Sequence, residues 1–143
     1  MSVGMLEIKD SIDDQDETFL ETALKQYAEL HSCPPYKETP LSIIKRDSNG
    51  HLVAGLTAQT VWNWLYIDML WVDEALRGQG IGSVLVAAAE KEALARGCHS
   101  AYLWTQSYEG PDFYPKLGYE KFVVNQDFPV GFQRIGFMKR LAT

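Results

Sequence analysis

A short glycine-rich segment in the middle of the chain constrains the fold more than any other feature. Residues 77–82 read Arg-Gly-Gln-Gly-Ile-Gly, between an apolar run at 65–72 and a segment with helical spacing that begins near Gly80. A run that is apolar on both faces predicts a central strand. The first turn of a helix has backbone N–H groups without intrahelical partners, and glycine lets an anion approach them closely. The segment therefore predicts a strand, a loop and a helix N-terminus that form an anion-binding site, with Arg77 as an added positive charge.

Two common phosphate-binding motifs do not fit this loop. A Walker A loop has the pattern G-x-x-x-x-G-K-[ST], and no such lysine follows the glycines here. A dinucleotide-binding loop has the pattern G-x-G-x-x-G, whereas Gly78, Gly80 and Gly82 follow G-x-G-x-G. A nucleotide-binding signalling domain is therefore the weaker interpretation. A tight turn that binds no ligand is the structural alternative.

The remaining pattern predicts one domain over residues 1–143, because this length suits a single hydrophobic core. Asp47-Ser48-Asn49-Gly50 predicts a hairpin turn between two strands. Apolar spacing predicts a helix from the Asp13 region to Leu30, a second from Gly80 to Ala95, and a short one at 111–117. Strands are predicted at 6–9, 41–46, 51–60, 65–72, 100–105, 119–124 and 132–141.

Composition narrows the class of protein. The formal net charge is −6, which argues against a nucleic-acid partner, and no apolar run approaches the roughly 18 residues of a membrane helix. The first residues lack a basic segment followed by an apolar one, so we do not expect secretion. Cys33 and Cys98 lack metal-ligand spacing and are interpreted as free thiols, which predicts a cytoplasmic protein with no metal site. The acidic residues concentrated in 1–60 form either a solvated surface or an attraction for a cationic substrate.

Two segments carry a resemblance to a known family. Residues 77–82 resemble the pyrophosphate loop of the GNAT superfamily of N-acetyltransferases, whose pattern is [QR]-x-x-G-x-[GA]. Residues 113–119, Phe-Tyr-Pro-Lys-Leu-Gly-Tyr, resemble the family's F-Y-x-K-x-G-[FY] segment at the expected distance. The resemblance implies an α+β (α/β) fold with a mixed, mostly antiparallel sheet of six to seven strands flanked by helices. It also implies that the fourth and fifth predicted strands, 65–72 and 100–105, splay apart.

The resemblance implies acetyl-CoA as cosubstrate. The pantetheine arm would pair with the strand backbone, and the pyrophosphate would lie on the loop N–H groups beside Arg77. Lys116 would reach a CoA phosphate; the alternative is a solvated lysine. The cofactor-binding residues expected in this way, besides Arg77 and Lys116, are Leu70, Trp71, Val72, Gly78, Gln79, Gly80, Ile81, Gly82 and Ser83.

Two residues are candidates for proton transfer. Tyr114 matches the family's general acid, and its phenol can donate a hydrogen bond; alternatively it is a core or lid tyrosine that only contacts CoA. Phe113 and Leu117, four residues apart, are expected to face the core and leave Tyr114 turned aside. Asp68 is the only charge in the run 65–72, and it is a candidate base, water relay or substrate ligand, or a structural carboxylate.

The implied function is transfer of an acetyl group from acetyl-CoA to a primary amine of a small molecule or peptide. The alternative is an acyl-CoA-binding module of the same fold without catalysis. Trp62, Trp64 and Tyr108 either wall an acceptor pocket or pack on the sheet. The resemblance also implies a possible homodimer, and no membrane or nucleic-acid partner is expected.

Overall fold

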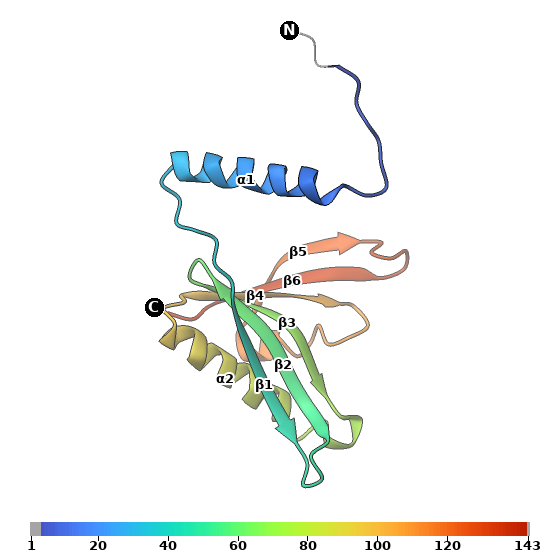
Figure 1. The fold of residues 1–143 in the computed structure, drawn as a ribbon. Coiled ribbons are helices and arrows are strands. Elements are labelled where there is room, and N and C mark those ends of the chain that lie inside the picture. The colour runs from blue at the N-terminus through green and yellow to red at the C-terminus, as the bar shows by residue number, and fades with distance from the viewer. Residues whose placement is uncertain (1–3, 143) are drawn as a thin grey trace. The chain divides into compact units, whose positions relative to one another are not determined.

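The computed structural model describes residues 4–142 and divides into two compact units, one ending at Pro35 and one beginning at Tyr36. The first unit contains helix α1, Asp14–Leu30 (Figure 1). Asp13 is its N-cap, and Asp14, Asp16 and Glu17 occupy the first turn, where negative charge interacts favourably with the helix dipole. Within this unit the helix buries none of its residues.

The strand predicted at 6–9 is wrong. Residues 4–9 are irregular, and Leu6 and Ile8 are exposed. Alternation of apolar and polar residues stabilises a strand only where a neighbouring strand accepts its backbone hydrogen bonds. The described part of the first unit contains no other strand, so this segment has no such neighbour there.

The second unit is a six-stranded mixed sheet, in agreement with the predicted fold class. The strands are β1 (Thr39–Arg46), β2 (Leu52–Val61), β3 (Trp64–Val72), β4 (Ser100–Gln106), β5 (Glu120–Gln126) and β6 (Gln133–Arg140). Their order in the sheet is β1-β2-β3-β4-β6-β5, and only β3 and β4 run parallel to each other. The hairpin predicted at Asp47–Gly50 joins β1 and β2, with the Asp47 carboxylate accepting from Asn49 N–H.

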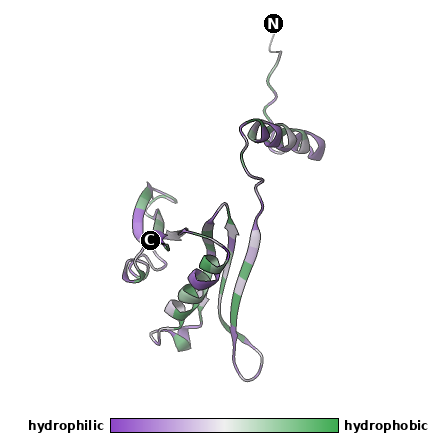
Figure 2. Cartoon of the chain, turned by 90° about the vertical axis from the view of Figure 1, so that its left-hand side faces the viewer, coloured by the Kyte–Doolittle hydropathy of each residue, from purple (hydrophilic) through white to green (hydrophobic). Residues whose placement is uncertain are grey.

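Helix α2, Ile81–Ala95, connects β3 to β4 and packs on β1, β2 and β3. Its buried residues recur every three or four positions, at Leu85, Val86, Ala89 and Ala93, so that one face lies on the sheet. Figure 2 shows hydrophobic and hydrophilic residues on both helices. The largest fully buried side chains are Phe137, Leu56, Leu65, Leu103 and Val86, which place the core between α2 and the sheet.

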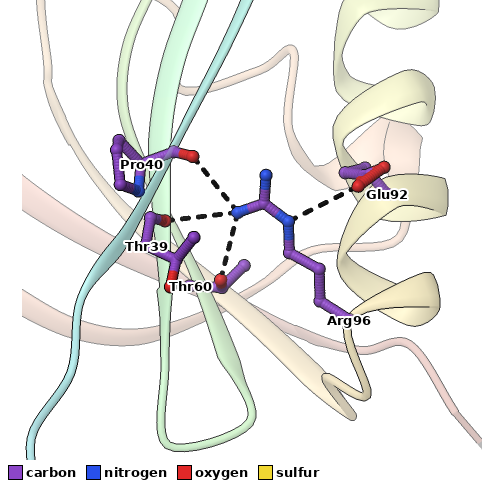
Figure 3. A network of polar contacts seen from close by, with 5 residues as sticks. All are labelled: Thr39, Pro40, Thr60, Glu92 and Arg96. Atoms are coloured by element: carbon purple, nitrogen blue, oxygen red, sulfur yellow. Dashed lines mark hydrogen bonds and ion pairs between the residues drawn. The ribbon is translucent and has the colours of Figure 1, made fainter.

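Arg96 joins the end of α2 to the edge of the sheet (Figure 3). One terminal nitrogen donates to the carbonyl oxygens of Thr39 and Pro40 and to the Thr60 hydroxyl, each at 3.2 Å, while Nε faces Glu92 at 3.5 Å. The guanidinium thereby satisfies carbonyl groups at the start of edge strand β1 and places positive charge at the helix C-terminus, where the dipole favours it.

The helix predicted at 111–117 is shorter than expected. Residues 111–114 form turns, and only Pro115–Leu117 is helical, as a 3-10 turn. Prolines at 111 and 115 lack the N–H group that a continuous helix would need at those positions.

Cys33 and Cys98 are both free cysteines, as predicted. Within residues 4–142, no helix is long and apolar enough to cross a membrane.

Candidate functional site

The site begins where β3 and β4 separate. The two strands pair from Trp64 with Ser100 to Ile67 with Leu103, and the pairing stops there although β3 continues to Val72 and β4 to Gln106. The divergence is visible in Figure 1, and it confirms the predicted splay. Strands that separate in this way leave backbone N–H and C=O groups of β3 available to a bound chain.

A cleft of about 930 Å³ opens at this divergence. It brings together residues that are far apart in the sequence, from the end of β3, the glycine loop, the first turn of α2, the end of β4 and the segment after it. Of the predicted site residues, the lining contains Asp68, Leu70, Trp71, Val72, Arg77, Gly78, Gly80, Ile81, Gly82, Ser83 and Tyr114. Gln79 and Lys116 are exposed and are not among the lining residues.

The glycine loop is held to the end of β3. A 3-10 turn, Glu74–Leu76, follows the strand, and the Asp73 carboxylate accepts the Ala75 N–H at 3.1 Å. Arg77 then folds back, and its Nε donates to the Val72 carbonyl oxygen at 3.0 Å. The Arg77 side chain thus anchors the loop while the residue remains exposed beside the cleft.

Two glycines shape the entrance to α2. Gly78 and Gly80 have φ angles of 79° and 80°, which side chains rarely allow, and a Cβ at either position would meet no atom within 4 Å. Open space is therefore kept directly in front of the helix N-terminus, which begins at Ile81. The N–H groups of this first turn and the helix dipole make this space suited to a phosphate group.

Gly82 has a different role from the other two glycines. A Cβ at this position would lie 3.2 Å from a ring carbon of Phe113, so the absence of a side chain allows the aromatic ring to pack on the helix start. Phe113 lies in the segment just before Tyr114, so this contact holds that segment against the glycine loop.

Tyr114 is buried, with 8% of its surface exposed, and it lines the cleft. Its ring packs in an aromatic cluster, with ring centroids 5.0 Å from Phe113, 5.9 Å from Tyr119 and 5.7 Å from Phe137. Burial, together with the negative charge of Glu109, raises the pKa of Tyr114 to about 12. The hydroxyl is therefore a stable hydrogen-bond donor at neutral pH.

Phe113 and Leu117 pack against the core, as expected, although both are only partly buried. The expectation that Tyr114 turns aside is wrong, because Tyr114 is the buried member of the three. The expectation rested on helical spacing, and residues 111–114 are not helical, so spacing of four residues does not apply there.

Asp68 lies at a bulge in β3. The register with β2 passes from Met69 opposite Thr57 to Ile67 opposite Ala58, so Asp68 is the extra residue. Its side chain is exposed and lines the cleft. Burial raises the pKa of Tyr66, as do the charge of Asp68 and a hydrogen bond from the Tyr66 hydroxyl to its carboxylate. The Asp68 carboxylate thus lies close enough to Tyr66 to affect its pKa and also has access to the cleft.

Comparison with known proteins agrees with this geometry. The family model described as the acetyltransferase (GNAT) family matches residues 6–119. The chain belongs to this family. The blasticidin-S acetyltransferase of Streptomyces morookaense is 35% identical over 106 residues, which cover 71% of this chain and 78% of that protein. The GNAT match extends into both units, and the single domain expected over 1–143 stays a prediction.

Solved structures of acetyltransferases have the same fold. An acetyltransferase from Bacillus cereus superposes with a TM-score of 0.83 at 28% identity, covering 94% of this chain and 97% of that one. An aminoglycoside 6'-N-acetyltransferase complexed with coenzyme A superposes with a TM-score of 0.65 at 21% identity, covering 93% and 97%. The protein is therefore an N-acetyltransferase, and members of this family use acetyl-CoA.

Some residues that line the cleft were not predicted from the sequence. Trp104 and Thr105 line it from β4, beyond the point where β3 separates, and Met69 and Leu76 line it from the other side. Tyr108, a candidate pocket wall from the sequence, does line the cleft, as does Glu109, whose carboxylate accepts the Gln106 N–H at 3.0 Å. Strand alternation could have placed Trp104, because the predicted splay exposes the end of β4. Trp64 lies outside this lining, and no cluster of metal-ligating residues is found within 4–142.

Proposed function

We propose that this protein transfers an acetyl group from acetyl-CoA to a primary amine of a small molecule. The observation that carries the proposal is the cleft itself. It joins open space before a helix N-terminus, the end of β3, which is unpaired on its β4 side, and a buried tyrosine. These are the features that a pyrophosphate, a pantetheine arm and a leaving thiolate require. The relative that acts on blasticidin S supports a small-molecule acceptor.

In this proposal the glycine loop and the end of β3 hold acetyl-CoA. Backbone N–H groups of Gln79–Ser83 and the charge of Arg77 bind the pyrophosphate, and Gly78 and Gly80 leave room for it. Leu70, Trp71 and Val72 pair with the amides of the pantetheine arm. Lys116, on the exposed 3-10 turn, contacts a more distant CoA phosphate. Acetyl-CoA supplies the thioester whose acetyl group is transferred.

The reaction also requires proton transfers, in which residues of the cleft take part. A lysine-like amine has a pKa of about 10.4 and attacks only when neutral, so Asp68 accepts its proton directly or through water. The amine nitrogen bonds to the carbonyl carbon and the carbon–sulfur bond breaks. Tyr114, with a pKa of about 12, donates a hydrogen bond to the leaving sulfur that strengthens as the carbon–sulfur bond breaks. The ammonium form of the acceptor loses two protons in all: Asp68 accepts the first before attack, and the second leaves the attacking nitrogen and ends on the sulfur, which departs as the CoA thiol.

Calorimetric titration with acetyl-CoA, with ATP and NAD as controls, tests the first step of the proposal. We expect micromolar binding of acetyl-CoA alone, followed by release of free CoA thiol when amines are added. Binding of ATP or NAD in preference to acetyl-CoA would overturn the assignment of the glycine loop. Acetyl-CoA binding without transfer to any amine would overturn the assignment of the acceptor class. A homodimer and a cytoplasmic location stay predictions.

A further inference from the structure

An aromatic groove lies beside the acetyl-CoA cleft. Its volume is about 320 Å³, and it is lined by Trp64, Tyr102, Trp104, Phe122 and Met138. These residues come from β3, β4, β5 and β6. Strand alternation directs them to the side of the sheet opposite the core residues Leu65 and Leu103. Trp104 lines both the groove and the cleft, so the two spaces meet at this side chain.

Arg134 is stacked at this junction. The central carbon of its guanidinium lies 3.7 Å from the ring centroid of Trp104 and 5.4 Å from that of Phe128. The residue opposite Trp104 on β6 is Gly136, where a Cβ would come within 2.8 Å of the Phe122 ring. Because Gly136 has no side chain, the Trp104 ring can pack against the Phe122 ring and also against the Arg134 guanidinium. The aromatic rings thereby hold the guanidinium in one orientation.

The guanidinium of Arg134 has no anionic partner within the second unit. Among residues 36–142 it forms no ion pair with a carboxylate, and its N–H groups donate no hydrogen bond. The other arginines of the sheet and of α2 differ: Arg46, Arg96 and Arg140 each donate to backbone carbonyl groups. The Arg134 guanidinium is planar, oriented by the aromatic rings and half-buried, so it is suited to bind a carboxylate through two parallel hydrogen bonds.

A carboxylate of the protein lies on the same side of the junction. The Tyr66 ring packs 4.9 Å from the Tyr102 ring, and burial and the nearby charge of Asp68 raise the pKa of the Tyr66 hydroxyl. The charges of Asp68 and Arg134 both act on this hydroxyl, with opposite effects on its pKa. No ion pair between Asp68 and Arg134 is found in the described part of the chain. The negative group therefore lines the cleft and the positive group stacks on the Trp104 ring that the cleft and the groove share, and the two do not pair with each other.

We propose that the acceptor is a primary amine that also carries a carboxylate, and that Arg134 binds this carboxylate while the amine lies toward Asp68 and the cleft. The inference rests on the proposed function and narrows its substrate class to amino acids and similar zwitterionic amines. The aromatic groove would take the apolar part of such a molecule. Arg134 is then a residue that determines specificity and takes no part in the proton transfers.

Matched pairs of amines, with and without the carboxylate, test the inference: phenylalanine against phenethylamine, and lysine against cadaverine. With acetyl-CoA fixed, we expect kcat/KM to favour the carboxylate member of at least one pair by roughly tenfold to a hundredfold. Arg134→Gln should bring that ratio close to one, mainly through KM, and leave acetyl-CoA affinity unchanged. Arg134→Lys should retain part of the preference. Arg140→Gln, which removes the same charge farther along β6, is the control and should retain the ratio.

The outcomes separate the inference from the proposed function. Transfer to phenethylamine and cadaverine without a preference for their carboxylate partners overturns the inference and leaves the proposed function standing. A preference that survives Arg134→Gln also overturns it. Transfer to none of the four amines, but to another small-molecule amine that has no carboxylate, also overturns the inference and leaves the proposed function standing.

Discussion

At the scale of single residues, Gly80 is the most direct test of the acetyl-CoA site. Gly80→Asp places bulk and negative charge in the open space before α2, where the pyrophosphate is proposed to lie. We expect acetyl-CoA affinity to fall by roughly a hundredfold, about 2.7 kcal/mol, because like charges meet at short distance. Calorimetric titration measures the loss.

Gly50→Asp is a matched control for this change. Gly50 also has a positive φ, +85°, and a Cβ there would meet no atom within 4 Å, but it lies in the β1–β2 hairpin turn. Both variants therefore bear the same backbone strain and the same added charge. Equal acetyl-CoA affinities in the two folded variants would show that the loop does not bind the pyrophosphate.

A second substitution tests whether Tyr114 donates to the leaving sulfur. Tyr114→Phe removes the hydroxyl and keeps the ring in its aromatic cluster. We expect kcat to fall by about 10² or more while acetyl-CoA affinity changes little, because the donor acts on the leaving sulfur. Steady-state rates at saturating acetyl-CoA from pH 7 to pH 9 measure the effect.

The neighbouring Tyr119→Phe variant separates chemistry from packing. The Tyr119 hydroxyl donates to Glu90 at 2.8 Å and is not among the groups that line the cleft. Loss of this buried bond should lower stability with little change in kcat. If Tyr114→Phe keeps the wild-type kcat, or if both variants lower it equally, Tyr114 does not act as the donor.

At the scale of secondary-structure elements, Arg96 joins α2 to edge strand β1. Arg96→Ala removes one charged donor from two carbonyl oxygens and one hydroxyl that all lie at 3.2 Å. We expect the free energy of unfolding to fall by about 2 kcal/mol, because bonds from charged donors contribute more than neutral ones. Urea denaturation measures this change.

Arg46→Ala is the comparison for Arg96. Arg46 donates a single bond, to the Gly50 carbonyl oxygen at 3.1 Å, in an exposed hairpin. Its loss should cost less than about 1 kcal/mol. A cost for Arg96→Ala no larger than that for Arg46→Ala would mean that the contact in Figure 3 does not hold the edge strand.

At the scale of the whole molecule, the buried tyrosine predicts how stability depends on pH. The pKa of Tyr114 rises to about 12 on folding from an unfolded value of 10.0. Below pH 10 the Tyr114 hydroxyl is protonated in both the folded and the unfolded state, and the folded state has its full stability. Between pH 10 and about 12 the hydroxyl ionises in the unfolded state but not in the folded state, so the free energy of unfolding falls. From pH 9 to pH 11 this loss amounts to about 1.3 kcal/mol.

The measurement is urea denaturation of the wild type and of Tyr114→Phe at pH 9 and pH 11. The difference in free energy of unfolding between the two proteins should shift in favour of the variant as pH rises. Tyr119, whose pKa is also raised by burial and by its hydrogen bond to Glu90, is present in both proteins. Its contribution to the loss of stability therefore cancels in the difference. A difference that does not change with pH would show that the Tyr114 hydroxyl titrates normally.

The local pattern of the sequence was sufficient for much of the fold. The hairpin at Asp47–Gly50, strand β3 and helix α2 follow from turn residues, a continuous apolar run and helical spacing, which are all short-range properties. The glycine loop could be placed for the same reason, because a strand, a glycine turn and a helix start are adjacent in the chain. Motif resemblance then identified the family.

Short-range patterns failed where a distant partner decides the conformation. Residues 6–9 alternate like a strand but have no strand beside them in their own unit, and Tyr114 is buried by Tyr119 and Phe137 rather than by helical spacing. The junction of Trp104 and Arg134 depends on which residue of β6 lies opposite β4. By itself the sequence determined the strand–loop–helix motif and the family. Tertiary structure alone decided the volume of the cleft, the burial that raises the pKa of Tyr114 and the pairing of Arg134 with its aromatic platform, because each depends on contacts between segments distant in the chain.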